Sequence, residues 1–219
     1  SMESVDDQQK SLDNDFALAL KLEDGIHLYL QPQIDLVSDR CVGAEALLRW
    51  ERKPKQFVPP PTILASIERQ GLRMPFNRWL IQQASQICAQ LLERKLDIVL
   101  SINLSANDLL EPDLPDMITL GLATWNVPTS RLLLEITETI MVDQTAQVME
   151  VFQRLRNAGL TLSIDDFGTG FSGMTYLKTL PVQEVKIDQI FIRNLANSPA
   201  DQEIAEATKG NWSEEAIID

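Results

Sequence analysis

Apolar, β-favouring runs alternate with segments of helical periodicity along most of this chain of 219 residues. The strand-like runs lie at 26–36, 41–50, 97–105, 131–139, 161–168 and 184–192. The helix-like segments lie at 62–70, 75–95, 114–125 and 144–158. Such alternation is typical of parallel strands joined by crossover helices, so it predicts an α/β fold. The short link at 37–40 also permits an antiparallel first pair of strands.

The segment before the first strand is polar and charged, which predicts a linker or lead-in helix rather than part of the core. Residues 15–22 have the pattern of a short helix. Ser1 precedes Met2 and is interpreted as a tag remnant. We therefore expect a lead-in segment at 1–25 and one domain at 26–219, with a stiff loop at Pro59, Pro60 and Pro61.

Side chains alternate between two faces along a strand, and the predicted strands divide consistently into two sets. One set is apolar. The other contains Tyr29, Gln31, Glu45, Arg49, Ser101, Asn103, Ser105, Glu135, Thr137, Ser163, Asp165, Lys186 and Asp188. An antiparallel sheet with one wet face would explain this division, but the intervening helices disfavour it. An open doubly wound sheet needs both faces apolar, so a TIM-type (β/α) barrel with a polar mouth fits better.

The polar set brings oxygen donors from four strands to one predicted face. They are Glu45, Asn103, Glu135 and Asp165, with Asp166 next along the chain. Any one of these carboxylates is explained by a salt bridge or a helix cap, whereas their convergence predicts a site. Hard oxygen donors suit Mg²⁺ or Mn²⁺. His27 is the only histidine, which excludes a histidine-based metal site and a Ser-His-Asp triad.

Two basic residues, Arg49 and Lys186, belong to the same polar set. Two metal ions held by carboxylates activate water in phosphodiester cleavage, and Arg and Lys are suitable partners for phosphate or for the attacking water. The alternative is a structural ion pair with Glu45 or Asp188, and the sequence leaves both interpretations open.

Gly168, Gly170 and Gly173 follow a strand with the G-x-G-x-x-G spacing of a dinucleotide-binding loop. Asp165 and Asp166 stand directly before the loop and would repel a pyrophosphate, which disfavours that interpretation. The D-F-G triplet of protein kinases also occurs at 166–168, but no H-R-D segment accompanies it.

The composition excludes several functional classes. The net charge of −13 argues against broad DNA binding, which requires basic residues. Cys41 and Cys88 are far apart and indicate a reducing compartment, which favours a cytoplasmic domain. No run of 18 apolar residues and no signal peptide occur in the chain.

Five short motifs follow one another along the chain. They are E-A-L at 45–47, S-I-N-L-S at 101–105, E-I-T-E-T at 135–139, D-D-F-G-T-G at 165–170 and K-I-D at 186–188. This ordered set resembles the EAL domain family of cyclic di-GMP phosphodiesterases from about Ile26 to Ile192. The resemblance implies a TIM-type barrel with an antiparallel first strand. It also implies hydrolysis of cyclic di-GMP to linear pGpG with Mg²⁺ or Mn²⁺.

The resemblance assigns a role to each matching residue. Metal ligands are implied at Glu45, Asn103, Glu135 and Asp165, with Asp166 serving a second metal ion. Lys186 resembles the lysine near the hydrolytic water, and Glu45, Asp166 and Lys186 form the implied catalytic set. Substrate contacts are implied at Gln31 and Arg49, and Glu138 resembles the glutamate that steadies the loop at 168–174. The family also implies a homodimer and fusion to sensory or cyclase domains in a parent protein that is free or attached to a membrane.

The sequence departs from the family pattern at its end. The family's later E-G-V-E and Q-G segments supply a further glutamate and a glutamine, and neither follows Asp188 here. A full barrel takes about 250 residues and eight strands, so we expect a domain that is truncated or diverged after about residue 205. The alternative function is a catalytically inactive cyclic di-GMP receptor.

Overall fold

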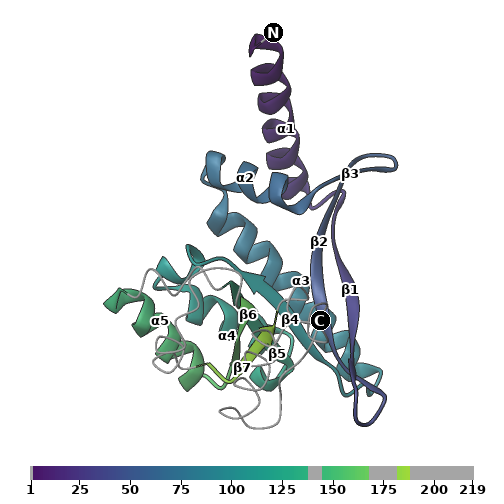
Figure 1. Ribbon diagram of the computed structural model, residues 1–219, viewed down its shortest axis with the longest axis vertical. Helices are drawn as coiled ribbons and strands as arrows, with labels where there is room; N and C mark the ends of the chain where they lie inside the picture. The colour runs from purple at the N-terminus through teal and green to yellow at the C-terminus, as the bar shows by residue number, and fades with distance from the viewer. Residues whose placement is uncertain (1, 138–144, 168–181, 188–219) are drawn as a thin grey trace, which may run out of the picture. The chain divides into compact units, whose positions relative to one another are not determined.

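The structure, a computed structural model, describes residues 2–137, 145–167 and 182–187 (Figure 1). The chain divides into two compact units, Ser1–Ile98 and Val99–Asp219, here called unit 1 and unit 2. Each unit is described by itself.

Unit 1 combines three helices with an antiparallel meander. Its elements are α1 (Met2–Leu22), β1 (Ile26–Asp35), β2 (Arg40–Lys53), β3 (Gln56–Val58), α2 (Pro60–Gln70) and α3 (Arg73–Glu93). β1 pairs with β2 in antiparallel register from Ile26↔Trp50 to Asp35↔Arg40, which confirms the antiparallel first pair. The turn between them closes on Asp35, whose carboxylate accepts the backbone N–H groups of Val37 and Ser38. The Ser38 contacts lower the pKa of Asp35.

Three local features of unit 1 differ from the sequence predictions. The predicted helix at 15–22 is the end of the much longer α1, which begins at Met2. Pro60 and Pro61 form the first turn of α2 rather than a loop, because proline suits the first helical positions, where no N–H partner is needed. The sequence analysis did not predict the three-residue strand β3, which pairs with the end of β2.

α1 is attached to the rest of unit 1 by an apolar and a polar contact. Phe16 is fully buried and meets the ring of Trp50 edge-on, with 5.1 Å between the ring centroids. Asp13 accepts hydrogen bonds of 2.7 Å from both Arg69 and Ser66 on α2. The polar contact therefore joins the middle of α1 to α2, one turn from the apolar contact.

The described residues of unit 2 form four parallel strands and two α-helices. Its elements are β4 (Val99–Leu104), a 3₁₀ turn (Asp108–Leu110), α4 (Leu114–Thr124), a 3₁₀ turn (Thr129–Arg131), β5 (Leu132–Thr137), α5 (Ala146–Asn157), β6 (Thr161–Phe167) and β7 (Glu184–Ile187). The strands follow one another in the order β4, β5, β6, β7. This parallel, helix-connected arrangement confirms the α/β prediction. Within the described part of unit 2 the sheet is open.

The apolar set of the predicted strands forms the core of unit 2. The residues Leu100, Ile102, Leu134, Ile136, Leu162 and Ile164 are all fully buried. α4 and α5 contribute the fully buried Ile118, Leu122, Val148, Phe152 and Leu155. Thr145 caps α5 by accepting the N–H of Val148, and Gly159 follows the helix with a φ of 83° that favours glycine. The opposite, polar set of the strands is thereby left on the other face of the sheet.

Replacing Ile102 by alanine tests this core. Ile102 is fully buried in β4, so Ile102→Ala is expected to lower the free energy of unfolding by about 2–5 kcal/mol. Urea denaturation followed by circular dichroism measures the change. Leu120→Ala on α4 is the matched control, because Leu120 is 70% exposed and its loss should change stability by less than about 0.5 kcal/mol. Equal effects of the two substitutions would contradict the assigned core.

The contact between Asp13 and Arg69 predicts a pH dependence of stability. Hydrogen bonding to Arg69 is the main cause that lowers the pKa of Asp13 from 3.8 to about 2. A carboxylate with a lowered folded-state pKa stabilises the fold above its unfolded pKa and loses that contribution as the pH falls towards the folded value. The contribution is therefore complete above about pH 4 and is lost between about pH 4 and pH 2.

Asp13→Asn is expected to lower stability at pH 6 by about 1 kcal/mol, a modest value because Arg69 is partly exposed. The difference from the unchanged protein should shrink towards pH 2 in denaturation curves. Asp6→Asn is the control, because Asp6 pairs with Lys10 on the exposed side of α1. A difference that persists unchanged at pH 2 would show that Asp13 does not act through its charge.

Candidate active site

A row of polar residues crosses the four parallel strands of unit 2. Asn103 on β4 pairs in register with Glu135 on β5, and Glu135 pairs with Ser163 on β6. Ser163 in turn pairs with Glu184 on β7. Register partners share a face of the sheet, so all four residues lie on the face opposite the apolar core set. The sheet register thus brings Asn103 and Glu135 together, as the parity of the strands predicted.

Lys186 connects Glu135 of this row with Asp165, which lies two residues beyond Ser163 on β6. Its Nζ lies 3.3 Å from Oε2 of Glu135 and 3.7 Å from Oδ1 of Asp165. The side chains of Lys186 and Glu135 are 2% and 0% exposed, whereas that of Asp165 is 19% exposed. Lys186 therefore reaches across β6 from β7 to β5 and donates a buried hydrogen bond to Glu135. The sequence prediction placed these three residues in one polar set, and the structure brings their charged groups together.

The pairing of β6 with β7 is irregular at the Asp165–Asp166 doublet. Ile164 pairs with Val185 and Phe167 pairs with Ile187, so two residues of β6 stand opposite the single residue Lys186. An extra residue on one strand is a β-bulge, which bends the strand and redirects its side chains. This irregularity lies beside the ion-pair cluster. A strictly alternating strand sends adjacent residues to opposite faces, and the bulge interrupts this alternation after Ile164.

The cluster on this face combines buried carboxylates with a buried ammonium group. Glu135 and Glu184 are 1% and 6% exposed, and Lys186, the buried cation beside Glu135, is 1% exposed. A buried carboxylate is stable only with a cation or with several hydrogen-bond donors. The oxygen atoms of Asn103, Glu135 and Asp165 are donors of the kind that Mg²⁺ and Mn²⁺ prefer. The donor chemistry on this face therefore fits a divalent cation.

No group of three acidic, histidine or cysteine side chains with the spacing of a metal site occurs among the residues that the structure describes. Two of the predicted acidic ligands in unit 2, Glu135 and Asp165, are described with their side chains. For Asp166 only the backbone is described, and Glu138 and the loop at 168–174 lie outside the described residues. Asp188, the alternative partner considered for Lys186, also lies outside them.

The remaining predicted site residues lie on the hairpin of unit 1. Gln31 on β1 is the direct cross-strand partner of Glu45 on β2, so the two side chains share one face of the hairpin. Arg49 lies on the same face, four residues beyond Glu45, and its guanidinium stands 5.9 Å from the ring centroid of Tyr29. The sequence predicted each of these residues separately, whereas their pairing becomes visible only with the strand register.

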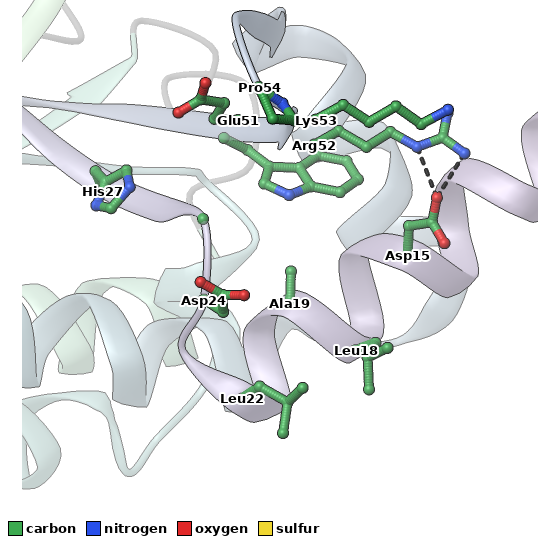
Figure 2. A pocket seen from close by; sticks show the side chains of 12 residues that line it. Asp15, Leu18, Ala19, Leu22, Asp24, His27, Glu51, Arg52, Lys53 and Pro54 are labelled. Atoms are coloured by element: carbon green, nitrogen blue, oxygen red, sulfur yellow. Dashed lines mark hydrogen bonds and ion pairs between the residues drawn. The ribbon is translucent and has the colours of Figure 1, made fainter.

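Unit 1 also has a surface pocket of about 600 Å³, shown in Figure 2. It is lined by α1 and by the end of the hairpin, including Leu18, His27 and Glu51, and the Arg52–Asp15 ion pair of 2.6 Å lies at its side. None of the predicted site residues lines this pocket. The polar face of the strands, rather than this pocket, is the candidate active site.

Glu184 is a buried acidic residue of the polar face that the sequence analysis missed. Its carboxylate accepts a hydrogen bond of 3.2 Å from the hydroxyl of Ser163. The signal was present in the sequence, because Glu184 has the same strand parity as Lys186.

Comparison with known proteins covers the part of the chain that contains these residues. The sequence profile described as "EAL domain" matches residues 13–210. A curated relative from Pseudomonas aeruginosa, cyclic di-GMP phosphodiesterase PA2567, is 38% identical over 88% of this chain and 33% of its own length. A second P. aeruginosa relative, the bifunctional diguanylate cyclase/cyclic di-GMP phosphodiesterase MucR, is 32% identical over 94% of this chain and 30% of its own length.

Among solved structures, the phosphodiesterase PaMucR in complex with c-di-GMP is similar to this chain with a TM-score of 0.80 and 32% identity, covering 89% of this chain and 79% of that one. The chain spans about a third of the length of the curated relatives. The residues that match the EAL profile, 13–210, include parts of both units. The structural similarity confirms the TIM-barrel-like fold of the α/β class. The chain therefore belongs to the EAL domain family.

Proposed function

We propose that this chain hydrolyses cyclic di-GMP to linear pGpG. The observation that carries the proposal is the buried Lys186–Glu135 pair with Asp165 beside it, on the polar face of parallel strands in an EAL domain. The relatives named as cyclic di-GMP phosphodiesterases and the c-di-GMP complex of PaMucR support this choice of substrate. Buried, paired ionisable groups on a polar face are typical of an active site.

In this proposal Lys186 acts on the water that attacks the phosphodiester. Its ammonium group has three donors and no acceptor, so it orients an oxygen lone pair. Glu135 and Asp165 hold the ammonium in place from two strands. Because the group is buried, its position and charge change little during the reaction, which is the condition for electrostatic catalysis.

Divalent cations complete the proposed site. Glu45, Asn103, Glu135 and Asp165 would hold one Mg²⁺ or Mn²⁺ ion, and Asp166 would serve a second. When bound, such ions lower the pKa of a coordinated water and stabilise charge on the phosphate oxygens. The hard oxygen donors on this face support the assignment, since Mg²⁺ and Mn²⁺ prefer carboxylate and amide oxygen ligands.

The hairpin of unit 1 supplies the proposed substrate contacts. Arg49 would bind a phosphate through its planar fork of N–H donors, and its stacking over Tyr29 restricts the rotamers of the guanidinium. Gln31 would contact the nucleotide next to Glu45. We assign Glu138 to the support of the loop at 168–174 by analogy with the family.

The biological context is part of the same proposal. We propose that residues 26–219 form the EAL domain preceded by a lead-in segment, that the domain is cytoplasmic, and that it forms a homodimer. We also propose that sensory or cyclase domains adjoin it, which the bifunctional name of the relative MucR supports. In the described residues, no helix combines the length and apolar character of a membrane span.

A second candidate function is binding of cyclic di-GMP without turnover. It is supported by the c-di-GMP complex of PaMucR, since a complex by itself shows binding of the nucleotide. The two candidates share the substrate-binding residues and differ in whether pGpG is formed.

The first test is incubation of the protein with cyclic di-GMP, followed by chromatographic analysis of the nucleotides. We expect pGpG to form with Mg²⁺ or Mn²⁺ and to disappear after chelation with EDTA, because the buried carboxylates then lack their cations. Calorimetry under the same conditions measures binding. Binding without any pGpG at high protein concentration would select the receptor function, and neither binding nor turnover would reject both candidates.

The second test replaces Lys186 by methionine. The methionine keeps the apolar stem but removes the donor, so kcat is expected to fall by about 10²–10⁴-fold. Lys10→Met on the exposed side of α1 is the control and should leave kcat unchanged. Since Lys186→Met leaves Glu135 buried beside a neutral group, the double variant Lys186→Met/Glu135→Gln serves as a charge-balanced second form. A folded double variant with full activity would show that the cluster is not catalytic.

A further inference from the structure

The position of Lys186 depends on how β7 is held against β6. β7 contains four residues, Glu184–Ile187, and its pairing with β6 becomes irregular directly at Lys186. The lysine must nevertheless reach over β6 to Glu135, with 3.3 Å between the charged atoms. A bulge interrupts the ladder of hydrogen bonds between two strands, so contacts beside the bulge help to hold β7 against β6.

Gln183, directly before β7, and Glu184, its first residue, provide such contacts. The backbone N–H of Gln183 donates to the carbonyl of Leu162 at 3.0 Å. The side-chain carbonyl of Gln183 accepts the backbone N–H of the same Leu162 at 2.9 Å. Gln183 therefore engages both polar backbone groups of Leu162, in the manner of an added strand residue. Leu162 is fully buried, so its backbone has a fixed position in the core and can hold Gln183 in place.

Glu184 adds a third contact one residue later. The hydroxyl of Ser163 donates to Oε1 of Glu184 at 3.2 Å, and both residues are buried. Ser163 lies between Glu135 and Glu184 in the row, and a hydroxyl has only one proton to donate. Because this proton goes to Glu184, it does not go to Glu135, whose Oε2 accepts from Lys186 instead.

We propose that Gln183 and Glu184 form a clamp that fixes β7 to β6 and thereby positions Lys186 between Glu135 and Asp165. They are positioning residues that act through Lys186 and have no contact with substrate in the mechanism. The catalytic part of this inference rests on the proposed phosphodiesterase function. Its structural part, the fixing of β7, does not.

The decisive comparison is between Glu184→Leu and Glu184→Gln. Leucine removes the acceptor of the Ser163 hydroxyl, whereas the glutamine carbonyl keeps it in the same place. We expect Glu184→Leu to lower kcat by on the order of 10²-fold with KM unchanged, since a small misplacement of a catalytic group costs that much. Glu184→Gln should restore most of kcat. Equal losses in the two variants, or wild-type kcat in Glu184→Leu, would overturn the proposal.

Gln183→Ala provides a second test. Gln183 is half-buried, so this substitution disturbs folding less than one at the buried Glu184. It should also lower kcat at unchanged KM, while Gln183→Glu, which keeps a side-chain acceptor, should restore it. The matched control is Gln153→Ala on α5, which removes an exposed hydrogen bond to Asn157 and should leave kcat unchanged. Melting temperatures identify any variant that fails to fold. Unchanged kcat in Gln183→Ala would count against the clamp.

Amide hydrogen exchange separates a failure of the clamp from a failure of the proposed function. If the unchanged protein forms no pGpG, the phosphodiesterase assignment fails, but exchange at Lys186 and Ile187 still reports how β7 is held. We expect faster exchange there in Glu184→Leu and Gln183→Ala, and wild-type exchange in Glu184→Gln. Unaltered exchange in the first two variants would overturn the clamp whatever the activity.

Discussion

The ion pair between Lys186 and Glu135 is the interaction on which the polar face of this protein depends. Each partner is almost completely buried, so either charge alone would destabilise the fold by several kcal/mol. The pair also joins two strands that are not neighbours, because β6 lies between β5 and β7. A residue of β7 is thereby tied to β5 in the parallel sheet. The same pair supplies the buried charges that the proposed chemistry uses.

The sequence predicted those parts of the structure that follow from periodicity. Alternating strand and helix segments predicted β4, β5, β6 and β7 and the helices between them, because a strand buried on one face has a period of two. The same parity predicted that Asn103, Glu135 and Asp165 share a face, and the strand register shows this for the first two directly. The short link at 37–40 correctly allowed the antiparallel hairpin of β1 and β2. The family motifs led to the EAL assignment.

Periodicity could not predict features that depend on contacts distant in sequence. α1 begins before its apolar pattern, and in this added part Asp13 contacts Arg69 and Ser66 of α2. The bulge opposite Lys186 breaks the alternation that the parity argument assumes. Glu184 has the parity of the site, but no motif distinguishes it from a surface residue. Its burial and its bond to Ser163 are visible only in the folded sheet.

The central claim is that side chains from separate strands of this EAL domain hold divalent cations beside Lys186. Crystals grown with Mn²⁺ and cyclic di-GMP, measured at the manganese absorption edge, test it most directly. The account predicts an anomalous peak about 2.1 Å from oxygen atoms of Glu135, Asp165 and Asn103, a distance typical of small hard cations. A fully loaded crystal with manganese only elsewhere on the surface, and none beside these residues, would contradict it.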